Sequence, residues 1–262
     1  MFFLDKFDAK SYDNSYDNSS KEKKVYDVFQ TISPHYDKMN DIISSRMHRR
    51  WKADLIKQIA TQKCLSVLDI CCGTGDIALR LAQENPHATI HGLDFSENML
   101  AAAEDRKTGL DLNNVLFHHG NAMALPFEDQ SFQCVTISFG LRNVPDYEQV
   151  LREMHRILEP EGTLYCLDSS YPDSPLVKPF FKVYFKFIMP AFASLFTRHK
   201  EEYKWLNDST EQFLTKNELA HLMKKIGFQE IALRSYFLGS AALHRGKKTT
   251  KKGDPPCTEK IL

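Results

Sequence analysis

A glycine-rich run flanked by acidic residues is the first part of this sequence whose spacing could do chemistry. In VLDICCGTGDIA, Gly73 and Gly75 lie between an apolar run and an amphipathic segment, as in a strand-to-helix turn. Glycines there let the backbone approach a ligand closely, and the helix N-terminus adds unpaired N–H groups. Asp94 ends the next apolar run, where a carboxylate can accept both hydroxyls of a ribose. These residues predict a nucleotide-binding site.

Two classes of nucleotide fit such a loop. The spacing G-x-G-x-x-A, followed by Asp94, matches a dinucleotide fingerprint and suggests an NAD-type oxidoreductase. Asp69 argues against it, because a carboxylate directly before the loop suits an ammonium or sulfonium group better than a pyrophosphate. Asn121 and Ala122 follow the third apolar run, where an amide and a backbone N–H can read an adenine edge. The combination favours S-adenosylmethionine, with a purely structural Asp69 as the alternative.

A second group of residues could act on an acceptor. Arg142 and Asn143 follow the fourth apolar run, at the edge where open α/β sheets bind ligands. Because arginine stays charged, Arg142 would stabilise a phenolate or orient a proton-accepting water rather than act as a base. His48 is a candidate proton acceptor, since the pKa of histidine lies near neutrality. The alternatives are an Arg142 paired with Asp146 or another acid, and a His48 that only caps a helix.

Alternating strands and helices must position these residues. The alternation predicts right-handed βαβ units, a mostly parallel sheet and one α/β domain. Hydrophobic patterning predicts strands at 66–70, 89–93, 115–118, 132–138, 163–167, 230–234 and 240–244, helices at 76–83, 96–103, 147–158 and 217–225, and a turn at 160–162.

The domain is expected to span residues 22–247. Residues 1–21 and 248–262 are polar and predicted to be disordered, since they hold too little apolar area to offset the entropy of ordering. An N-terminal helical lid carrying Tyr36, Asp37, Asn40, His48, Arg49 and Trp51 is expected over the donor pocket. An aromatic insertion at 175–206 could line a prenyl groove, rest on a membrane, or simply pack in the core.

Composition limits the partners. The 34 basic and 34 acidic residues give a formal net charge of zero, so nucleic acid is not expected as a ligand. The six cysteines show no metal-binding spacing, so no metal is expected. The longest charge-free apolar window, 187–196, is too short to span a bilayer. Without a signal-peptide pattern at its start, the chain is expected in the cytoplasm.

Four motifs together resemble a known family. VLDICCGTGD, GLDFSENML, GNAMALPF and SFGLRNVPD are similar to the quinone-biosynthesis C-methyltransferases, and the resemblance runs from about Lys24 to Lys247. VPDYEQVLREMHRILEP and the aromatic block look especially like the menaquinone branch. The resemblance implies a class I S-adenosylmethionine-dependent methyltransferase fold, Rossmann-like, with a mostly parallel seven-stranded sheet.

The resemblance also implies which residues bind the donor. They are Thr74, Asp94, Asn121 with Ala122, and Ser138, beside the loop residues Asp69, Gly73 and Gly75. Two segments depart from the family pattern. EPEG replaces the usual KPGG turn, and Asp168-Ser-Ser replaces a Glu-centred segment near the substrate side.

The implied reaction is C-methylation of demethylmenaquinol to menaquinol, the last step of menaquinone biosynthesis. The in-class alternative is C-methylation of 2-methoxy-6-polyprenyl-1,4-benzoquinol in the ubiquinone pathway; a non-catalytic donor-binding module is the alternative outside enzymes. The expected partner is a prenylated quinol. Two associations stay open, a homodimer and peripheral contact with the inner face of the cell membrane.

Overall fold

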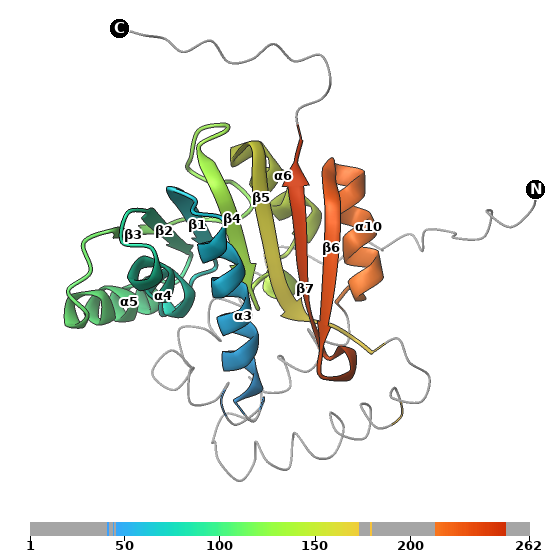
Figure 1. Cartoon of the computed structure of the whole chain (residues 1–262), viewed down its shortest axis with the longest axis horizontal. Helices are drawn as coiled ribbons and strands as arrows, with labels where there is room; N and C mark the ends of the chain where they lie inside the picture. Colours follow the sequence, from blue (N-terminus) through green and yellow to red (C-terminus); the bar gives the residue numbers. More distant parts are fainter. Residues whose placement is uncertain (1–40, 42–43, 45, 173–178, 180–212, 250–262) are drawn as a thin grey trace, which may run out of the picture.

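A parallel sheet is the centre of the molecule. A computed structural model of the chain describes residues 41, 44, 46–172, 179 and 213–249. Within these residues, seven strands form one sheet in the order β3-β2-β1-β4-β5-β7-β6 (Figure 1). Neighbours from β3 to β5 pair in parallel, and β7 is antiparallel to both β5 and β6. The predicted α/β class, the mostly parallel sheet and the number of strands are confirmed.

The elements lie close to their predicted places. The strands are β1 (Ser66–Ile70), β2 (Thr89–Asp94), β3 (Val115–His119), β4 (Phe132–Ser138), β5 (Leu158–Ser169), β6 (Phe228–Tyr236) and β7 (Ala241–Lys248). The helices are α3 (Met47–Thr61), α4 (Asp76–Glu84), α5 (Glu97–Gly109), α6 (Tyr147–Ile157) and α10 (Lys216–Ile226), with short 3₁₀ turns η2 (Leu141–Asn143) and η4 (Phe237–Gly239).

The predicted turn at 160–162 is wrong in one respect. Strand β5 begins at Leu158, which pairs with Phe132, rather than at Thr163. The register shifts between Phe132 and Cys134, and Glu161 takes a left-handed φ of 65°. The Pro-Glu-Gly sequence therefore forms an irregularity within the strand instead of a connection before it.

Helix starts follow from capping side chains. Ser96, Asp146 and Thr215 each accept a hydrogen bond from a backbone N–H in the first turn of α5, α6 and α10, respectively. At α10, Glu218 completes a capping box by accepting from the backbone of Thr215. Such caps satisfy N–H groups that have no partner inside the helix, so these three side chains mark where α5, α6 and α10 begin.

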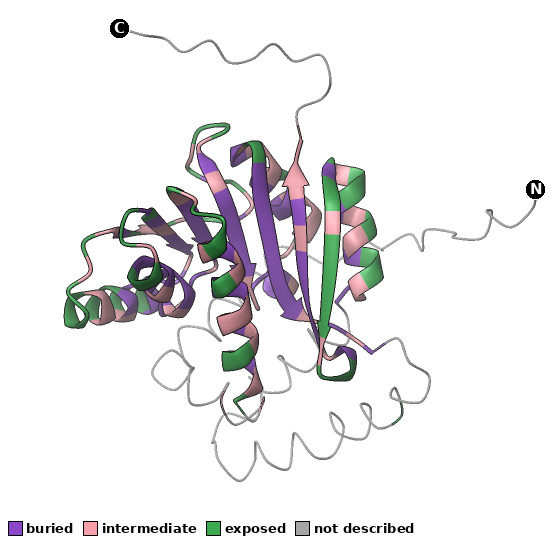
Figure 2. Cartoon of the chain, viewed as in Figure 1, coloured by how far each residue is buried: buried purple, intermediate pink, exposed green. Residues whose placement is uncertain are grey.

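Helices cover both faces of the sheet (Figure 2). Residues of β1 alternate between two cores, with Val67 packed among α3 and α4 and Leu68 and Ile70 packed among α6 and α10. Asp69 shares the face of Val67, because successive side chains of a strand point to opposite sides. Asp69 therefore lies on the α3–α4 side of the sheet.

The strand order reverses between β1 and β4, since β2 and β3 lie on one side of β1 and β5 on the other side of β4. Open α/β sheets bind ligands at the carboxyl ends of the strands beside such a reversal. No helix among the described residues is long and apolar enough to cross a membrane. Residues 1–21, Tyr36, Asp37, Asn40 and nearly all of the insertion 175–206 lie outside the described residues.

Candidate functional site

The loop between β1 and α4 forms an open backbone cradle. Cys71, Gly73 and Gly75 have φ values of 54°, 54° and 77°, so the chain turns through left-handed conformations. A Cβ atom added at Gly73 would meet no atom within 4 Å. One added at Gly75 would lie 2.9 Å from Cζ of Phe117, so packing requires glycine there. The first glycine leaves room for a ligand and the second permits close packing of the helix.

Asp94 holds this cradle in place. Its Oδ2 accepts a hydrogen bond of 2.8 Å from the Gly73 N–H, and its Oδ1 accepts one of 2.9 Å from the Ser96 N–H. Burial raises the pKa of Asp94, while these N–H donors oppose the rise. A carboxylate oxygen has two lone pairs, so both oxygens can still accept ligand hydroxyls. The structure thus brings Asp94 next to the loop, as predicted.

Asp69 is a buried acid beneath the cradle. Burial raises its pKa to about 8; Lys52 opposes this rise, whereas the charges of Asp76 and Asp94 add to it. The Lys52 ammonium is also buried and lies 2.9 Å from Oδ2 of Asp76, at the start of α4. A cationic ligand above Asp69 would favour its ionised form, because opposite charges attract strongly where water is excluded.

Lys52 is a residue that sequence reasoning missed. It lies on α3 four positions after His48, and both side chains are buried on the same face of the helix. The sequence did contain a signal for it. Lys52 occupies a core-facing position of an amphipathic helix, and a lysine is almost never fully buried there unless it is paired. Its pairing with Asp76 ties α3 to the glycine loop.

Thr74 is fixed by a second missed residue. Arg106, on α5, donates from one terminal nitrogen to the Thr74 carbonyl at 3.0 Å and to its hydroxyl at 2.9 Å. Thr74 is buried, and the contact joins α5 to the turn. Thr74, which is predicted to contact the methyl donor, is therefore fixed by a side chain of α5.

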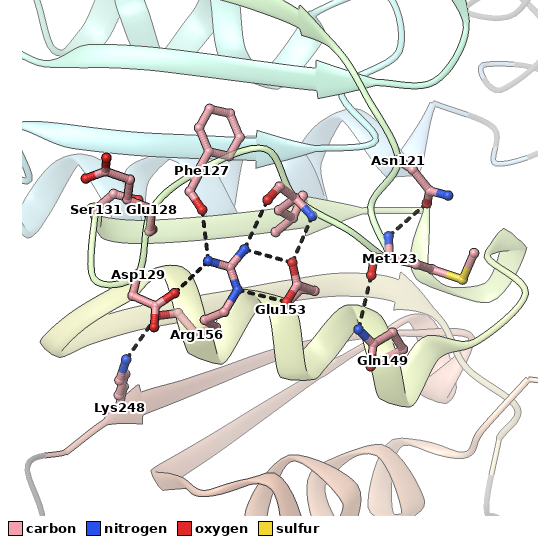
Figure 3. A network of polar contacts seen from close by, with 11 residues as sticks. Asn121, Met123, Phe127, Glu128, Asp129, Ser131, Gln149, Glu153, Arg156 and Lys248 are labelled. Carbon is pink, nitrogen blue, oxygen red and sulfur yellow. Dashed lines mark hydrogen bonds and ion pairs between the residues drawn. The ribbon is translucent and has the colours of Figure 1, made fainter.

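The loop after β3 is held by a polar network on α6 (Figure 3). Oδ1 of Asn121 accepts a hydrogen bond of 2.9 Å from the Met123 N–H, while Gln149 donates to the Met123 carbonyl at 3.1 Å. Glu153 accepts from the Leu125 N–H at 2.8 Å. Ala122 is buried and Asn121 is exposed, so the amide group of Asn121 stays accessible to a ligand.

Arg156 is the cation of this network and was also missed. It pairs with Glu153 at 2.8 Å and donates to the carbonyls of Leu125 and Phe127 at 3.0 and 2.8 Å. Hydrogen bonding to Glu153 raises the pKa of Arg156. Contacts of this kind between a helix and a loop leave no periodic pattern, so the role of Arg156 could not be predicted from the sequence.

Arg142 lies in η2, directly after β4, and is nearly buried. One terminal nitrogen donates to Oδ1 of Asp168 at 2.6 Å and to Oγ of Ser169 at 3.0 Å, both at the end of β5. The Arg142 guanidinium also lies 5.7 Å from the centre of the Phe139 ring. Among the alternatives left open by the sequence, the paired acid is Asp168 rather than Asp146.

Three buried polar atoms near this turn have no hydrogen-bond partner among the described residues. They are Nε of Arg142, Oδ1 of Asn143 and Oγ of Ser138. The amide nitrogen of Asn143 donates to the Phe139 carbonyl at 3.1 Å, which fixes the orientation of its side chain. Buried polar atoms without partners are uncommon in folded proteins, and a bound ligand is one way to satisfy them.

His48 lies at the beginning of α3. Its Nδ1 is 2.6 Å from Oγ of Ser44, and its Nε2 is 3.8 Å from Oδ1 of Asp41. Burial and the charge of Lys52 lower the pKa of His48, so the ring is neutral at pH 7. A neutral imidazole has one nitrogen able to accept a proton. The ring of Trp51, one helical turn on, lies 6.4 Å from that of Phe139.

The residues present fit a nucleoside donor with a cationic centre. The cradle at Gly73 is open, Asp94 lies beside it with spare lone pairs, and Asp69 lies buried beneath it. Ser138, at the end of β4, adds a hydroxyl without a partner in the described structure. The structure thus gathers the predicted donor residues at the reversal of strand order, with Arg142 and Asn143 directly after them.

Comparison with known proteins gives one consistent result. The chain matches the model of the ubiE/COQ5 methyltransferase family over residues 17–248. The demethylmenaquinone methyltransferase of Listeria monocytogenes serotype 4a (strain HCC23) is 47% identical over 230 residues, covering 87% of this chain and 97% of that relative. The protein of the same name from Geobacillus kaustophilus (strain HTA426) is 46% identical over 232 residues, covering 88% and 99%.

A solved structure agrees on the fold. One similar structure is that of an S-adenosylmethionine-dependent methyltransferase from Thermotoga maritima, described as a possible histamine N-methyltransferase. It superposes on this chain with a TM-score of 0.62 and is 21% identical to it in sequence. The match covers 86% of this chain and all of that one. At this identity the likeness establishes the shared methyltransferase fold, as predicted from the motifs.

Proposed function

Because this chain belongs to the ubiE/COQ5 methyltransferase family, we propose that its site methylates a ring carbon of demethylmenaquinol to give menaquinol. The chain is a S-adenosylmethionine-dependent methyltransferase, and its relatives over most of its length are named for demethylmenaquinone. The observation that supports the chemistry best is the buried guanidinium of Arg142, fixed on Asp168 next to the donor cradle.

Residues of the cradle would hold the methyl donor. Asp94 would accept the ribose hydroxyls, Asn121 and Ala122 would contact the adenine, and Asp69 would face the positive charge. Gly73 leaves the backbone open, and Thr74 and Ser138 complete the pocket. When bound, S-adenosylmethionine supplies an electrophilic methyl group on its sulfonium, and S-adenosylhomocysteine is the product.

Arg142 would act on the acceptor. A quinol ring carbon becomes nucleophilic when a hydroxyl loses its proton, because the phenolate oxygen pushes electron density into the ring. A guanidinium that is always charged and already oriented by Asp168 can stabilise that phenolate without reorganising during the reaction. Nε of Arg142 and Oδ1 of Asn143 have no hydrogen-bond partner among the described residues, and the acceptor would supply one.

His48 would accept the quinol proton. Burial and the charge of Lys52 lower the pKa of His48, which favours the neutral ring. In the tautomer whose Nδ1–H donates to Oγ of Ser44, Nε2 is the nitrogen that would take the proton. Asp41, at 3.8 Å, would stabilise the imidazolium that results. The donor would supply its methyl group to the ring carbon as the carbon–sulfur bond breaks. The ring proton would pass to water, and the proton held by His48 would return to the oxygen, which restores the aromatic quinol.

Product analysis tests the function. Purified protein is given S-adenosylmethionine with reduced demethylmenaquinone or with the reduced ubiquinone precursor, and extracted lipids are examined by mass spectrometry. A mass gain of one methyl group on the naphthoquinol is expected. Methylation of the benzoquinol alone would contradict the proposal and favour the ubiquinone-pathway reaction.

Ligand binding tests the cofactor assignment separately. Calorimetry should show binding of S-adenosylhomocysteine and no binding of NAD, the ligand of the oxidoreductase alternative. The Arg142→Ala variant should keep its affinity for S-adenosylhomocysteine and lose most of its turnover, since Arg142 acts on the acceptor. Equal losses of both would place Arg142 in the donor half of the site.

The expected associations are also proposals. A prenylated quinol partitions into membranes, so we expect the enzyme to meet it at the bilayer surface. A homodimer is a second expectation, which light scattering of the purified protein can test.

A further inference from the structure

A strained turn presents two large apolar side chains to solvent. Phe237 and Leu238, in η4 between β6 and β7, are 58% and 69% exposed. Their φ values are 36° and 56°, and Gly239 follows with 93°, so three successive residues are left-handed. Left-handed conformations are costly for residues other than glycine, and they persist where the surrounding structure enforces them. The turn therefore holds these side chains outward at an energetic cost.

This turn lies at the substrate edge of the sheet. Strands β6 and β5 are both antiparallel to β7, so the end of β6 lies at the same edge as the ends of β1, β4 and β5. The turn in dark red that joins β6 to β7 lies at the same end of the sheet as the arrowhead of β5 (Figure 1). Ser170, two residues after Asp168, donates its backbone N–H to the Ser240 carbonyl at 2.9 Å. The exposed pair is thus tied to the segment that orients Arg142.

A basic cluster lies next to this turn. Trp51 of α3 stacks on Tyr236, with ring centres 5.8 Å apart, directly before Phe237. Asp54, one turn further along α3, accepts hydrogen bonds from both Arg234 and Tyr236. Trp51 lies nearer the start of α3 than Asp54 and contacts the end of β6, so the first turn of α3, with its N-cap residue Arg46, points toward η4. The Arg46 side chain is 79% exposed, and Arg49 and Arg50 are exposed as well. Asp41 lies 2.5 Å from Arg49 and 4.0 Å from Arg46, so the cluster holds one carboxylate and three guanidinium groups and keeps a net positive charge.

Exposed apolar tips beside basic side chains are features that bind anionic bilayers. Apolar side chains enter the boundary between headgroups and acyl chains, and arginines attract anionic lipids. Exposed apolar residues could also bind a protein partner. A bilayer accounts in addition for the basic cluster beside them, at the edge of the sheet where the lipid substrate would enter.

We propose that Phe237, Leu238 and the basic first turn of α3 form a docking surface for an anionic lipid bilayer, here named the η4–α3 surface. It would hold the carboxyl edge of the sheet against the membrane, so that a prenylated quinol reaches Arg142 without leaving the lipid. The lipid substrate in this inference rests on the proposed function. The location of the surface rests on the exposed side chains, the strained backbone of η4 and the charge of the arginines.

Vesicle sedimentation of the full chain tests the surface. Vesicles of phosphatidylcholine with phosphatidylglycerol should bind the protein at low salt, and binding should weaken as salt rises, since arginine contributes through screened attraction. The double variant Phe237→Ser, Leu238→Ser should bind at least about tenfold more weakly. Arg46→Gln with Arg50→Gln should remove the preference for phosphatidylglycerol over pure phosphatidylcholine.

A matched control uses exposed leucines elsewhere. Leu65, which precedes β1 at the opposite edge, and Leu116 on β3 are 60% and 45% exposed. The variant Leu65→Ser, Leu116→Ser should bind vesicles like the unsubstituted chain. A Phe237→Trp variant gives an independent measurement, because its emission should shift to shorter wavelength when phosphatidylglycerol vesicles are added. Absence of that shift, unchanged binding by the Phe237–Leu238 variant, or an equal loss in the control would overturn the proposal.

Turnover separates this proposal from the proposed function. A water-soluble quinol with a truncated tail should be methylated equally well by the unsubstituted chain and the Phe237–Leu238 variant in the absence of vesicles. The KM of that variant for long-tailed quinol in vesicles should rise with kcat unchanged. If the unsubstituted chain methylates neither quinol, the proposed function is wrong; if it methylates both and the variant matches it in vesicles, only the docking surface is wrong.

Discussion

Arg142 and Asp168 form a buried ion pair, with 2.6 Å between the guanidinium nitrogen and Oδ1, that joins the turn after β4 to the end of β5. The Arg142 backbone N–H also donates to Oδ2 of Asp168, at 3.2 Å. One oxygen of this carboxylate thus orients the guanidinium, while the other holds the backbone of the same residue. The segment that departs from the family pattern therefore supplies the partner of the residue we assign to the acceptor.

The variant Asp168→Asn should lower kcat at least about tenfold and leave S-adenosylhomocysteine affinity within about twofold, because it loosens Arg142 without touching the donor cradle. Removing one partner of a buried pair should also lower the free energy of unfolding by about 3–5 kcal/mol. Steady-state kinetics, calorimetry and urea denaturation measure the three quantities.

Two control variants accompany Asp168→Asn. Asp168→Glu keeps the charge and should recover part of kcat. Asp146→Asn changes the acid that caps α6 into another good cap, so neither kcat nor stability should fall appreciably. A loss of donor affinity as large as the loss of kcat would show that Asp168 supports the whole site rather than Arg142.

Replacing Asp94 should weaken donor binding. Asp94→Ala removes the acceptor of the ribose hydroxyls and should cost about 1–3 kcal/mol in S-adenosylhomocysteine affinity. It also leaves the N–H groups of Gly73 and Ser96 without their acceptor, so thermal stability should fall as well. Calorimetry on folded protein checks the first effect. Unchanged affinity would remove Asp94 from the donor site.

Donor binding should strengthen as the pH rises. The raised pKa of Asp69, about 8, means that the acid is largely protonated below that pH, whereas a cationic donor favours its anion. Affinity for S-adenosylhomocysteine, which keeps the ammonium group, should therefore increase by up to about tenfold per pH unit between pH 6 and pH 8, then level off. Calorimetry at several pH values measures the slope.

The Asp69→Asn variant isolates this effect from the titration of His48 and other groups. Its affinity should be low and much less dependent on pH. In the free protein the sign is opposite: an acid with a raised pKa contributes stability that is lost as pH rises from about 4 to 8. The stability of Asp69→Asn relative to the unsubstituted chain should accordingly improve over that range, and a constant difference would contradict the assignment.

Two glycines of one loop should respond differently to alanine. Gly75→Ala places a methyl group 2.9 Å from Phe117 and should lower the free energy of unfolding by about 2–4 kcal/mol. Gly73→Ala meets no neighbour, so the left-handed φ alone should cost about 1–2 kcal/mol. Its methyl group would enter the cradle and weaken donor binding instead. Urea denaturation and calorimetry on the pair measure both effects.

The sequence predicted most elements because their signals are local. Short apolar runs mark β1 and β4, and Ser96 and Asp146 mark helix starts. The start of β5 could not be predicted, since a Pro-Glu-Gly turn within a strand is stabilised by pairing across the sheet with Phe132.

Site residues could be predicted where their position at a strand end suffices to place them. Those that depend on contacts between distant segments could not. Asp94, Arg142 and the glycines follow strand ends, so their meeting at one edge follows from a parallel sheet. The pairs Lys52–Asp76 and Arg106–Thr74 join segments that are far apart in the sequence, and no local sequence pattern indicates that these residues meet in space.

The last prediction concerns the redox state of the acceptor. Only the quinol has a hydroxyl whose deprotonation makes the ring carbon nucleophilic, while the carbonyls of the oxidised quinone withdraw electron density. The sequence has no second dinucleotide motif and no Cys-x-x-Cys pair, so nothing in its motifs indicates that the chain reduces its own acceptor. We expect methyl transfer to demethylmenaquinone only when a reductant such as dithionite is present.

Radiolabelled methyl incorporation into extracted lipid, measured anaerobically with and without dithionite, checks this expectation. A variant of Arg142 tests the phenolate mechanism in the same assay, because the proposed role of Arg142 is to stabilise the phenolate. Arg142→Lys keeps the positive charge but loses the fork that binds Asp168 and Ser169, so it should retain only a small part of the reductant-dependent rate. Equal incorporation into fully oxidised quinone would show that the ring carbon is activated in another way, and the phenolate mechanism would then be wrong.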